Sequence, residues 1–125
     1  MMVNILCIDN SKTIRQVVKD CVLDLNYGFF EAKDGNAGID LADSIDSLKM
    51  IIIDWNIPGF SGGDILNYFR SNDKFNNLLI LVLIGIENKE DVIKAIGMGA
   101  NMYILKPFSV SNLQDKIEEM IKNAA

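Results

Sequence analysis

The sequence predicts an α/β fold in which helices cover both faces of a doubly wound, five-stranded parallel sheet. Five short apolar runs alternate with segments of helical periodicity, and 125 residues with 50% hydrophobic side chains suit one packed core. Strict alternation of strand and helix requires parallel strands joined by right-handed crossovers. We therefore expect a single three-layer domain over residues 1–125, and an end just past the last helix suits a complete domain.

The five expected strands are short runs of aliphatic and aromatic residues. Residues 50–53 and 78–84 are apolar at every position, as expected for central strands that are buried on both faces. The strands are expected at residues 3–8, 27–32, 50–53, 78–84 and 102–105.

The first and last helices have the clearest patterns. Ser11 is a plausible N-cap for the first helix, which is expected to end near Asn26, and Ser111 with Gln114 fits a capping box at the start of the last. The helices between them are expected at residues 36–44, 63–71 and 89–98. The buried stripe of the first helix consists of Ile14, Val17, Val18, Cys21, Val22 and Leu25, and that of the last consists of Leu113, Ile117, Met120 and Ile121.

The composition argues against several classes of function. Seventeen acidic and twelve basic residues give a net charge of −5, and the bases are scattered, so direct binding to nucleic acid is not expected. The longest apolar stretch, residues 78–86, is much shorter than the roughly 20 residues that a membrane span needs, and no secretory leader is evident. We therefore expect a cytoplasmic protein without membrane insertion.

The available side-chain chemistry is also restricted. Histidine is absent, which removes the commonest general base, the Ser-His and Cys-His nucleophile pairs and most zinc sites. Cys7 and Cys21 lie in separate apolar patterns without CxxC spacing, so they are interpreted as small core residues. Any chemistry must therefore rely on carboxylates, lysine, hydroxyl groups or a hard cation.

Two acids and a lysine are expected to converge at one edge of the sheet. Ligands of open parallel sheets bind beyond the carboxyl ends of the strands, where the sequence places Asp9 with Asn10, Asp54, and Lys106. Two facing carboxylates repel each other unless a cation lies between them, and Mg²⁺ typically takes one or two carboxylates together with water and phosphate oxygens. Lys106 can hold a phosphoryl oxygen, and a carboxylate can itself accept a phosphoryl group.

Each of these residues also has a purely structural interpretation. An aspartate after a strand is often a helix cap or a turn former, and a lysine before a proline is most often solvated. Residues 58–63 are typical of a turn, no P-loop motif is present, and the glycines at 97 and 99 are typical of a helix C-cap. Only the combination of Asp9, Asp54 and Lys106 predicts a site.

The sequence around these residues resembles the receiver domain of two-component response regulators, in particular the stand-alone chemotaxis (CheY-like) type. The segment IIIDWNIPG at residues 51–59 resembles the phosphoacceptor strand and its loop, and GANMYILKPF at residues 99–108 resembles the segment containing the family's lysine. The separations from Asn10 to Asp54 and from Asp54 to Lys106 match those of the family without a gap. The resemblance covers nearly the whole chain and implies a flavodoxin-like sheet with strand order 2-1-3-4-5.

The resemblance implies that Asp54 accepts a phosphoryl group from a phosphohistidine on a sensor histidine kinase. Mg²⁺ would be held by Asp9, Asp54 and the backbone carbonyl of Asn56, Lys106 would pair with the phosphoryl oxygens, and the bond before Pro107 would be cis. The protein would be a signalling phosphoacceptor and not a conventional enzyme, although such receivers can catalyse their own phosphotransfer and dephosphorylation.

The resemblance also implies an output surface. Tyr103 occupies the position of an aromatic residue whose rotamer reports phosphorylation. A surface built from the fourth helix, the fifth strand and the fifth helix would meet a downstream effector or a motor or switch protein, and it would include Val92, Tyr103, Leu105 and Phe108. Because this surface often carries dimer contacts in the family, we expect a monomer or a weak dimer.

Two residues depart from the family pattern. Asn10 replaces a usual second acid and leaves only an amide oxygen, which predicts weaker Mg²⁺ binding. Ile84 replaces a serine or threonine whose hydroxyl bonds the phosphoryl group, although isoleucine also suits an apolar central strand. A hydrogen bond to a charged group contributes about 1.5 to 3 kcal/mol and allosteric coupling typically about 1 to 3, so the missing bond could equal the whole switch energy.

Three other functions stay open at this point. A degenerate receiver that binds a partner without phosphorylation is favoured by Asn10 and Ile84. An aspartyl-phosphate phosphatase would have a second aspartate where the chain has Asn56. A flavodoxin-like electron carrier would need a hydroxyl- and glycine-rich loop after the first strand, which residues 9–12 do not supply.

Overall fold

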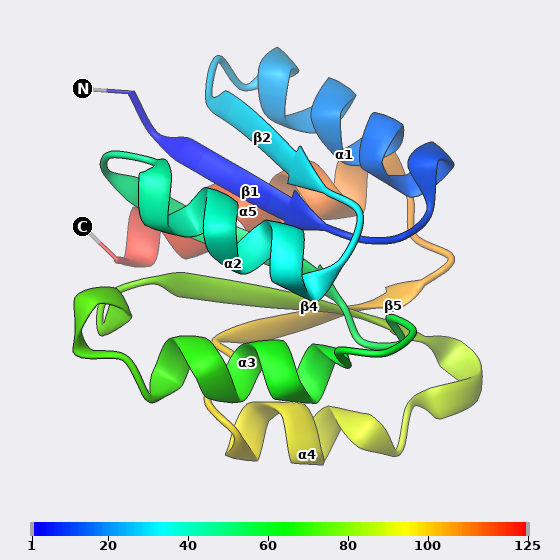
Figure 1. Cartoon of the computed structure of the whole chain (residues 1–125). Helices are drawn as coiled ribbons and strands as arrows, with labels where there is room; N and C mark the ends of the chain where they lie inside the picture. The colour runs from blue at the N-terminus through cyan, green and yellow to red at the C-terminus, as the bar shows by residue number, and fades with distance from the viewer. Residues whose placement is uncertain (1, 125) are drawn as a thin grey trace.

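The computed structural model describes residues 2–124 and contains a five-stranded parallel sheet between two layers of helices (Figure 1). The strand order is β2-β1-β3-β4-β5, and each neighbouring pair is parallel. The predicted fold class and strand order are therefore confirmed. The strands are β1 (Asn4–Ile8), β2 (Gly28–Ala32), β3 (Leu48–Asp54), β4 (Leu79–Gly85) and β5 (Met102–Lys106).

Helices α1 and α5 cover one face of the sheet, and α2, α3 and α4 cover the other (Figure 1). The helix expected at residues 89–98 is shorter than predicted, because residues 89 and 90 form a turn that follows a separate 3₁₀ segment at residues 86–88. No helix within residues 2–124 is long and apolar enough to span a membrane. The helices are α1 (Lys12–Asp24), α2 (Gly35–Ser44), α3 (Gly62–Arg70), α4 (Asp91–Gly97) and α5 (Val110–Asn123), with 3₁₀ turns η1 (Asp73–Phe75) and η2 (Ile86–Asn88).

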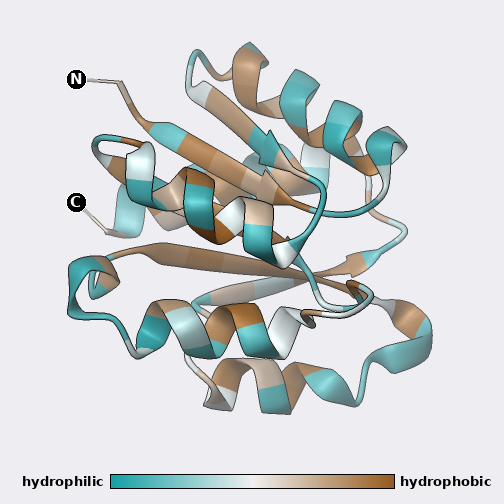
Figure 2. Cartoon of the chain, viewed as in Figure 1, coloured by the Kyte–Doolittle hydropathy of each residue, from teal (hydrophilic) through white to brown (hydrophobic). Residues whose placement is uncertain are grey.

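The two faces of the sheet bury different side chains of the same strands. Successive residues of a strand point to opposite faces, so Met50 and Ile52 pack toward α1 and α5, whereas Ile51 and Ile53 pack toward α2, α3 and α4. All seven residues of β4 are buried, and Figure 2 shows this strand as hydrophobic along its length. The expectation that the third and fourth strands lie at the centre is confirmed.

Side-chain caps define the starts of α1 and α3. The hydroxyl oxygen of Ser11 accepts a hydrogen bond from the Ile14 N–H at 3.2 Å, which confirms the predicted N-cap of α1. At the start of α3, Ser61 and Asp64 form a capping box that we did not predict from the sequence. The cap holds the end of the loop that follows β3.

The predicted capping box at the start of α5 is wrong. The N-cap of α5 is Ser109, whose hydroxyl oxygen accepts from the Asn112 N–H at 3.0 Å. Because the helix starts two residues earlier than the Ser111 prediction requires, Ser111 lies within the first turn. The amide of Gln114 donates instead to the backbone carbonyl of Cys21 at 3.3 Å, which ties α5 to α1.

Arg70 joins the end of α3 to the turns at the amino-terminal edge of the sheet. Its guanidinium donates to the Gly99 carbonyl at 2.8 Å, to the Phe75 carbonyl at 3.4 Å and to Asn101 Oδ1 at 2.7 Å. The same Asn101 oxygen accepts from the Ile80 N–H at 2.8 Å. One charged side chain therefore satisfies three acceptors, two of which are backbone carbonyls with no strand partner.

We expect Arg70→Ala to lower the free energy of unfolding by about 2 to 3 kcal/mol, because three acceptors lose a charged donor. Urea denaturation gives the value. The matched control is Lys116→Ala, which removes only a peripheral pair with Glu119 at 4.0 Å and should cost about 0.5 kcal/mol or less. Equal losses in the two variants would show that the Arg70 hydrogen bonds carry no special stability.

Candidate functional site

The strand register brings the three predicted site residues together. Ile8 of β1 pairs with Ile53 of β3, so Asp9 and Asp54 follow as neighbours at the carboxyl ends of adjacent strands. Lys106 is the last residue of β5, and its Nζ lies 2.8 Å from Asp54 Oδ1. The edge of the sheet therefore holds two carboxylates and one ammonium group, as the sequence predicts.

Both carboxylates lie in the protein interior. Asp9 is fully buried and Asp54 is 5% exposed, and they are the only buried polar or charged residues in the described part of the chain. Asp9 Oδ1 accepts a hydrogen bond from the Ser11 N–H at 2.8 Å, whereas Asp9 Oδ2 is buried and has no hydrogen-bond partner within residues 2–124. A buried carboxylate oxygen without a donor is costly, so the site is incomplete without a positive group.

The pKa of Asp9 reflects this environment. Burial raises the pKa of the Asp9 carboxyl above its usual value, the Ser11 N–H opposes that shift, and the negative charge of Asp54 raises the pKa further. The positive charges of Lys106 and Arg15 act in the opposite direction with smaller effects. A divalent cation beside both carboxylates would remove the repulsion between them.

Arg15 is a residue of this site that we did not single out in the sequence. Its Nη1 donates to the backbone carbonyl of Asp9 at 2.7 Å, and its Nε lies 2.8 Å from Glu31 Oε1 on β2. The guanidinium therefore holds the backbone at Asp9 in place. Arg15 lies next to the buried stripe of α1, and nothing in the apolar periodicity marks it.

The structure places the other predicted residues of the site around this core. Asn10 and Asn56 are exposed and lie two residues beyond the last residues of β1 and β3, and the Lys106–Pro107 peptide bond is cis. Ile84 is fully buried in the apolar layer beneath α2, α3 and α4. It has no polar atom in its side chain and continues the hydrophobic strand β4.

The residues of the predicted output surface lie on both sides of the edge strand β5. Val92, Tyr103 and Leu105 are half-buried on the face covered by α2, α3 and α4. Phe108 packs on the opposite face, where with Ile14 it lines a cavity of about 400 Å³ that reaches Lys106. Phe108 follows β5, the edge strand of the sheet, and packs on the α1 and α5 side, whereas Val92, Tyr103 and Leu105 pack on the other side.

Two isoleucines that we did not predict extend this surface. Ile93 and Ile96 of α4 are 84% and 41% exposed. They are three residues apart and therefore share one face of the helix. The sequence could have indicated them, because both are apolar residues of α4 that do not lie on the helix face of the buried Ala95.

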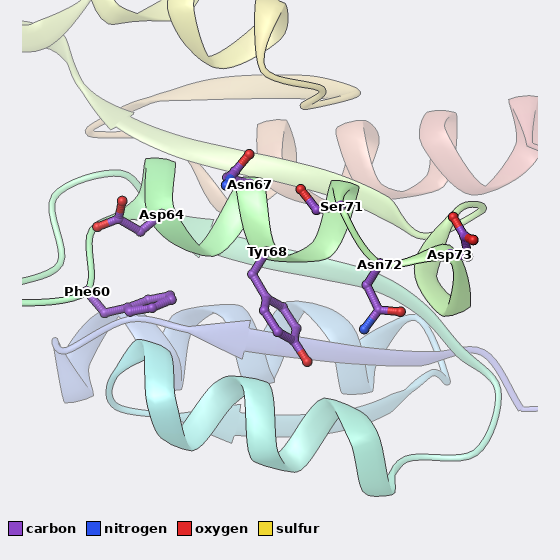
Figure 3. A pocket seen from close by; sticks show the side chains of 7 residues that line it. All are labelled: Phe60, Asp64, Asn67, Tyr68, Ser71, Asn72 and Asp73. Carbon is purple, nitrogen blue, oxygen red and sulfur yellow. The ribbon is translucent and has the colours of Figure 1, made fainter.

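A second hollow, of about 730 Å³, lies beside α3 and away from Asp9, Asp54 and Lys106 (Figure 3). In this view Tyr68 extends from α3 toward α2, and the Phe60 ring lies against Gly35 at the start of α2. The Asp64 carboxylate in its wall is already used in the α3 capping box. The hollow is lined by Phe60, Asp64, Asn67, Tyr68, Ser71, Asn72 and Asp73.

The donor set at the sheet edge suits a hard cation. No group of three or more histidine, cysteine, aspartate or glutamate side chains within residues 2–124 is arranged to hold a metal ion. Mg²⁺ does not need such a group, because it binds through one or two carboxylates and keeps several waters. Asp9 and Asp54 supply the two carboxylates, and the unpartnered Asp9 Oδ2 fits a ligand atom.

Comparisons with known proteins agree with this geometry. The family model described as response regulator receiver domain matches residues 5–118. The chain belongs to the response regulator receiver family. It is 30% identical over 119 residues to the chemotaxis protein CheY of Pseudomonas aeruginosa, covering 94% of this chain and 95% of that protein. Identity to CheY1 of Helicobacter pylori strain 26695 is 32% over 118 residues, again covering 94% of this chain and 95% of the relative.

The three-dimensional comparison points to the same family. The structure of the chemotaxis response regulator CheY4 of Vibrio cholerae superimposes with a TM-score of 0.88 at 26% identity, covering 96% of this chain and 99% of that one. The receiver is therefore CheY-like and of the two-component type. Receivers of this type are signalling proteins and not conventional enzymes.

We expect Asp9→Asn to stabilise the fold by about 1 kcal/mol or more near pH 7 when divalent cations are chelated, because the variant removes a buried negative charge. The folded-state pKa of the Asp9 carboxyl lies above its ordinary value of 3.8. The contribution of Asp9 to stability is therefore most favourable below pH 3.8, and it is lost as the pH rises through the folded-state pKa. The advantage of the variant should therefore shrink as the pH is lowered toward about 4.

Urea denaturation of both proteins at several pH values measures this difference. The control is Asp40→Asn, which changes an exposed aspartate on α2 and should give a difference that is small at every pH. A gain for Asp9→Asn that does not depend on pH would contradict the electrostatic explanation.

Proposed function

We propose that this receiver accepts a phosphoryl group on Asp54 from a phosphohistidine of a sensor histidine kinase and signals in the cytoplasm through a separate partner protein. The observation that carries the proposal is the 2.8 Å contact between Lys106 Nζ and Asp54 Oδ1, beside a second buried carboxylate with an unpartnered oxygen. This supports the proposal because a carboxylate, an ammonium group and a second acidic side chain lie together at one sheet edge.

The transfer step uses the chain's own residues as follows. An oxygen of Asp54 forms the new P–O bond as the P–N bond to the donor imidazole breaks, and the imidazole leaves with the electron pair and takes up a proton. Within residues 2–124 no hydrogen bond occupies Asp54 Oδ2, so this oxygen is available for the attack. Lys106 is 26% exposed and pairs with a phosphoryl oxygen as its bond to the Asp54 carboxylate is replaced.

The cation proposed for this site is Mg²⁺, held by Asp9, Asp54 and the backbone carbonyl of Asn56, with the amide oxygen of Asn10 as a weak additional ligand. When bound, it would neutralise charge on the transferring phosphoryl group. Arg15 supports the arrangement by fixing the Asp9 backbone, and the Ser11 N–H orients the Asp9 carboxylate.

The partner surface proposed for the output consists of Val92, Ile93, Ile96, Tyr103, Leu105 and Phe108. It joins α4 to β5, and its partner would be a downstream effector or a motor or switch protein. Because Ile84 offers no hydroxyl to a phosphoryl group, we expect Tyr103 to respond weakly or by another route.

Incubation with Mg²⁺ and acetyl phosphate should add one phosphoryl group to the wild-type chain, as read by intact mass. Borohydride reduction of the acyl phosphate, followed by peptide mapping, should locate the group at Asp54. Asp54→Asn should abolish the gain, because an amide cannot form the acyl phosphate. Lys106→Met should reduce the yield at least about tenfold, because the phosphoryl oxygens lose their positive partner.

Asp64→Asn is the matched control, since Asp64 lies in the same loop-to-helix region but serves the α3 cap. Its phosphoryl uptake should equal that of the wild type. No uptake by the wild-type chain from acetyl phosphate or from a phosphorylated histidine kinase would leave the degenerate receiver, which binds its partner without phosphorylation, as the function.

We expect Asn10→Asp to tighten Mg²⁺ binding by about tenfold or more, because a carboxylate replaces an amide at the rim of the site. Titration followed by the fluorescence of Trp55, the only tryptophan of the chain, gives the affinity. Asn72→Asp, at the cap of η1, is the control for the added charge and should leave the affinity unchanged. An unchanged affinity in Asn10→Asp would place the cation away from residue 10.

A further inference from the structure

The residue that follows the proposed phosphoacceptor is hydrogen-bonded to the first residue of α4. Trp55 Nε1 donates to Asp91 Oδ2 at 3.1 Å, and the two residues are 36 positions apart in the sequence. Trp55 is 8% exposed and belongs to the apolar layer beneath α2, α3 and α4. The indole therefore provides a direct polar link between the loop after β3 and α4.

Trp55 is held closely on its backbone side as well. Its N–H donates to the Leu83 carbonyl at 2.9 Å, and its own carbonyl accepts from the Gly62 N–H at 3.1 Å. A side chain at position 62 would approach the Trp55 Cα to 2.7 Å, so only glycine permits this contact. The two hydrogen bonds and the close contact with Gly62 leave little space around the Trp55 backbone. We therefore expect that a shift of the Trp55 backbone also moves its indole ring.

The position of Trp55 in the proposed site gives this link its significance. Trp55 lies between Asp54, the proposed phosphoacceptor, and Asn56, whose carbonyl is a proposed cation ligand. Both peptide groups of Trp55 therefore connect to groups that change partners when the site is loaded. Any reorientation there acts on the residue that is bonded to Asp91.

Helix α4 is the shortest of the three α-helices in this layer. It contains seven residues, and no side chain caps its amino terminus. Ile84, at the end of the neighbouring strand, contacts the same apolar layer but has no donor or acceptor in its side chain. The hydrogen bond from Trp55 is the only side-chain hydrogen bond to α4 in the described residues.

We propose that the Trp55–Asp91 hydrogen bond couples loading of the phosphoryl site to the position of α4, and so to the surface that carries Ile93 and Ile96. The inference rests on the proposed function. It assigns the coupling to an indole and a carboxylate at a site where residue 84 cannot supply a hydroxyl. Coupling through one bond also predicts that α4 responds while the α1 and α5 face does not.

Hydrogen exchange with and without Mg²⁺ and beryllofluoride, a mimic of a phosphoryl group on a carboxylate, tests the proposal. Loading should change the exchange of the amides at residues 91–97 in the wild type by about fivefold or more, with little change in α5. Trp55→Phe and Asp91→Ala should lose most of this change. Asp91→Asn should retain it, because its amide oxygen still accepts the hydrogen bond.

Tyr27→Phe is the matched control. It also removes a hydrogen bond from an aromatic donor to a carboxylate, that of Glu118, but on the opposite face of the sheet. Its α4 response should equal that of the wild type. Bound beryllofluoride is followed by ¹⁹F NMR, which does not depend on Trp55, and its affinity in Asp91→Ala should stay within about threefold of wild type.

Two results would overturn the coupling and leave the proposed function standing. One is a wild-type chain that binds beryllofluoride without any change at residues 91–97. The other is a full α4 response in both Trp55→Phe and Asp91→Ala. Failure of the wild type to bind beryllofluoride at all would overturn the proposed function, and the coupling with it.

Discussion

The burial of two carboxylates at the end of an apolar sheet is the constraint on which this structure depends. Asp9 and Asp54 lie at the ends of strands that are mostly hydrophobic, and the register leaves them side by side. One ammonium group, one backbone N–H and a more distant guanidinium are the positive groups that oppose their repulsion. A sheet edge of this kind is prepared to bind a cation, because a cation supplies the positive charge that the two carboxylates lack.

The strands and the segments that connect them are restrained to different extents. Each of the three inner strands is paired on both sides, and side-chain caps fix the starts of α1, α3 and α5. The proposed site lies where β3 ends and its connection begins, and the connection after β4 leads to α4. In the proposed coupling, the link between the site and α4 is the Trp55–Asp91 hydrogen bond.

Much of the fold and the centre of the site could be predicted from the sequence, because both follow from patterns with a simple physical origin. Apolar runs and their alternation with helices gave the layers, and the ends of the strands gave Asp9, Asp54 and Lys106. The start of α5 could not be predicted with certainty, because both Ser109 and Ser111 have the chemistry of an N-cap and only the path of the preceding turn selects between them.

The remaining contacts depend on distances that a linear pattern does not contain. Arg15, Arg70 and the bond between Trp55 and Asp91 join segments that meet only after the helices pack on the sheet. Phe108 was assigned to the output surface from the family resemblance. It follows the edge strand β5 and packs on the α1 and α5 side, so the proposed surface spans both sides of that strand.

The uncharged, fully buried strand β4 has a consequence for synthesis of the chain. Its seven residues, Leu79–Gly85, leave the ribosome before β5, whose pairing covers one of its two edges. Until residues 102–106 are available, a nascent sheet ending at β4 would present an unprotected hydrophobic margin of the kind that recruits strands from other molecules. Rapid addition of the last strand would therefore guard the newly made protein against aggregation.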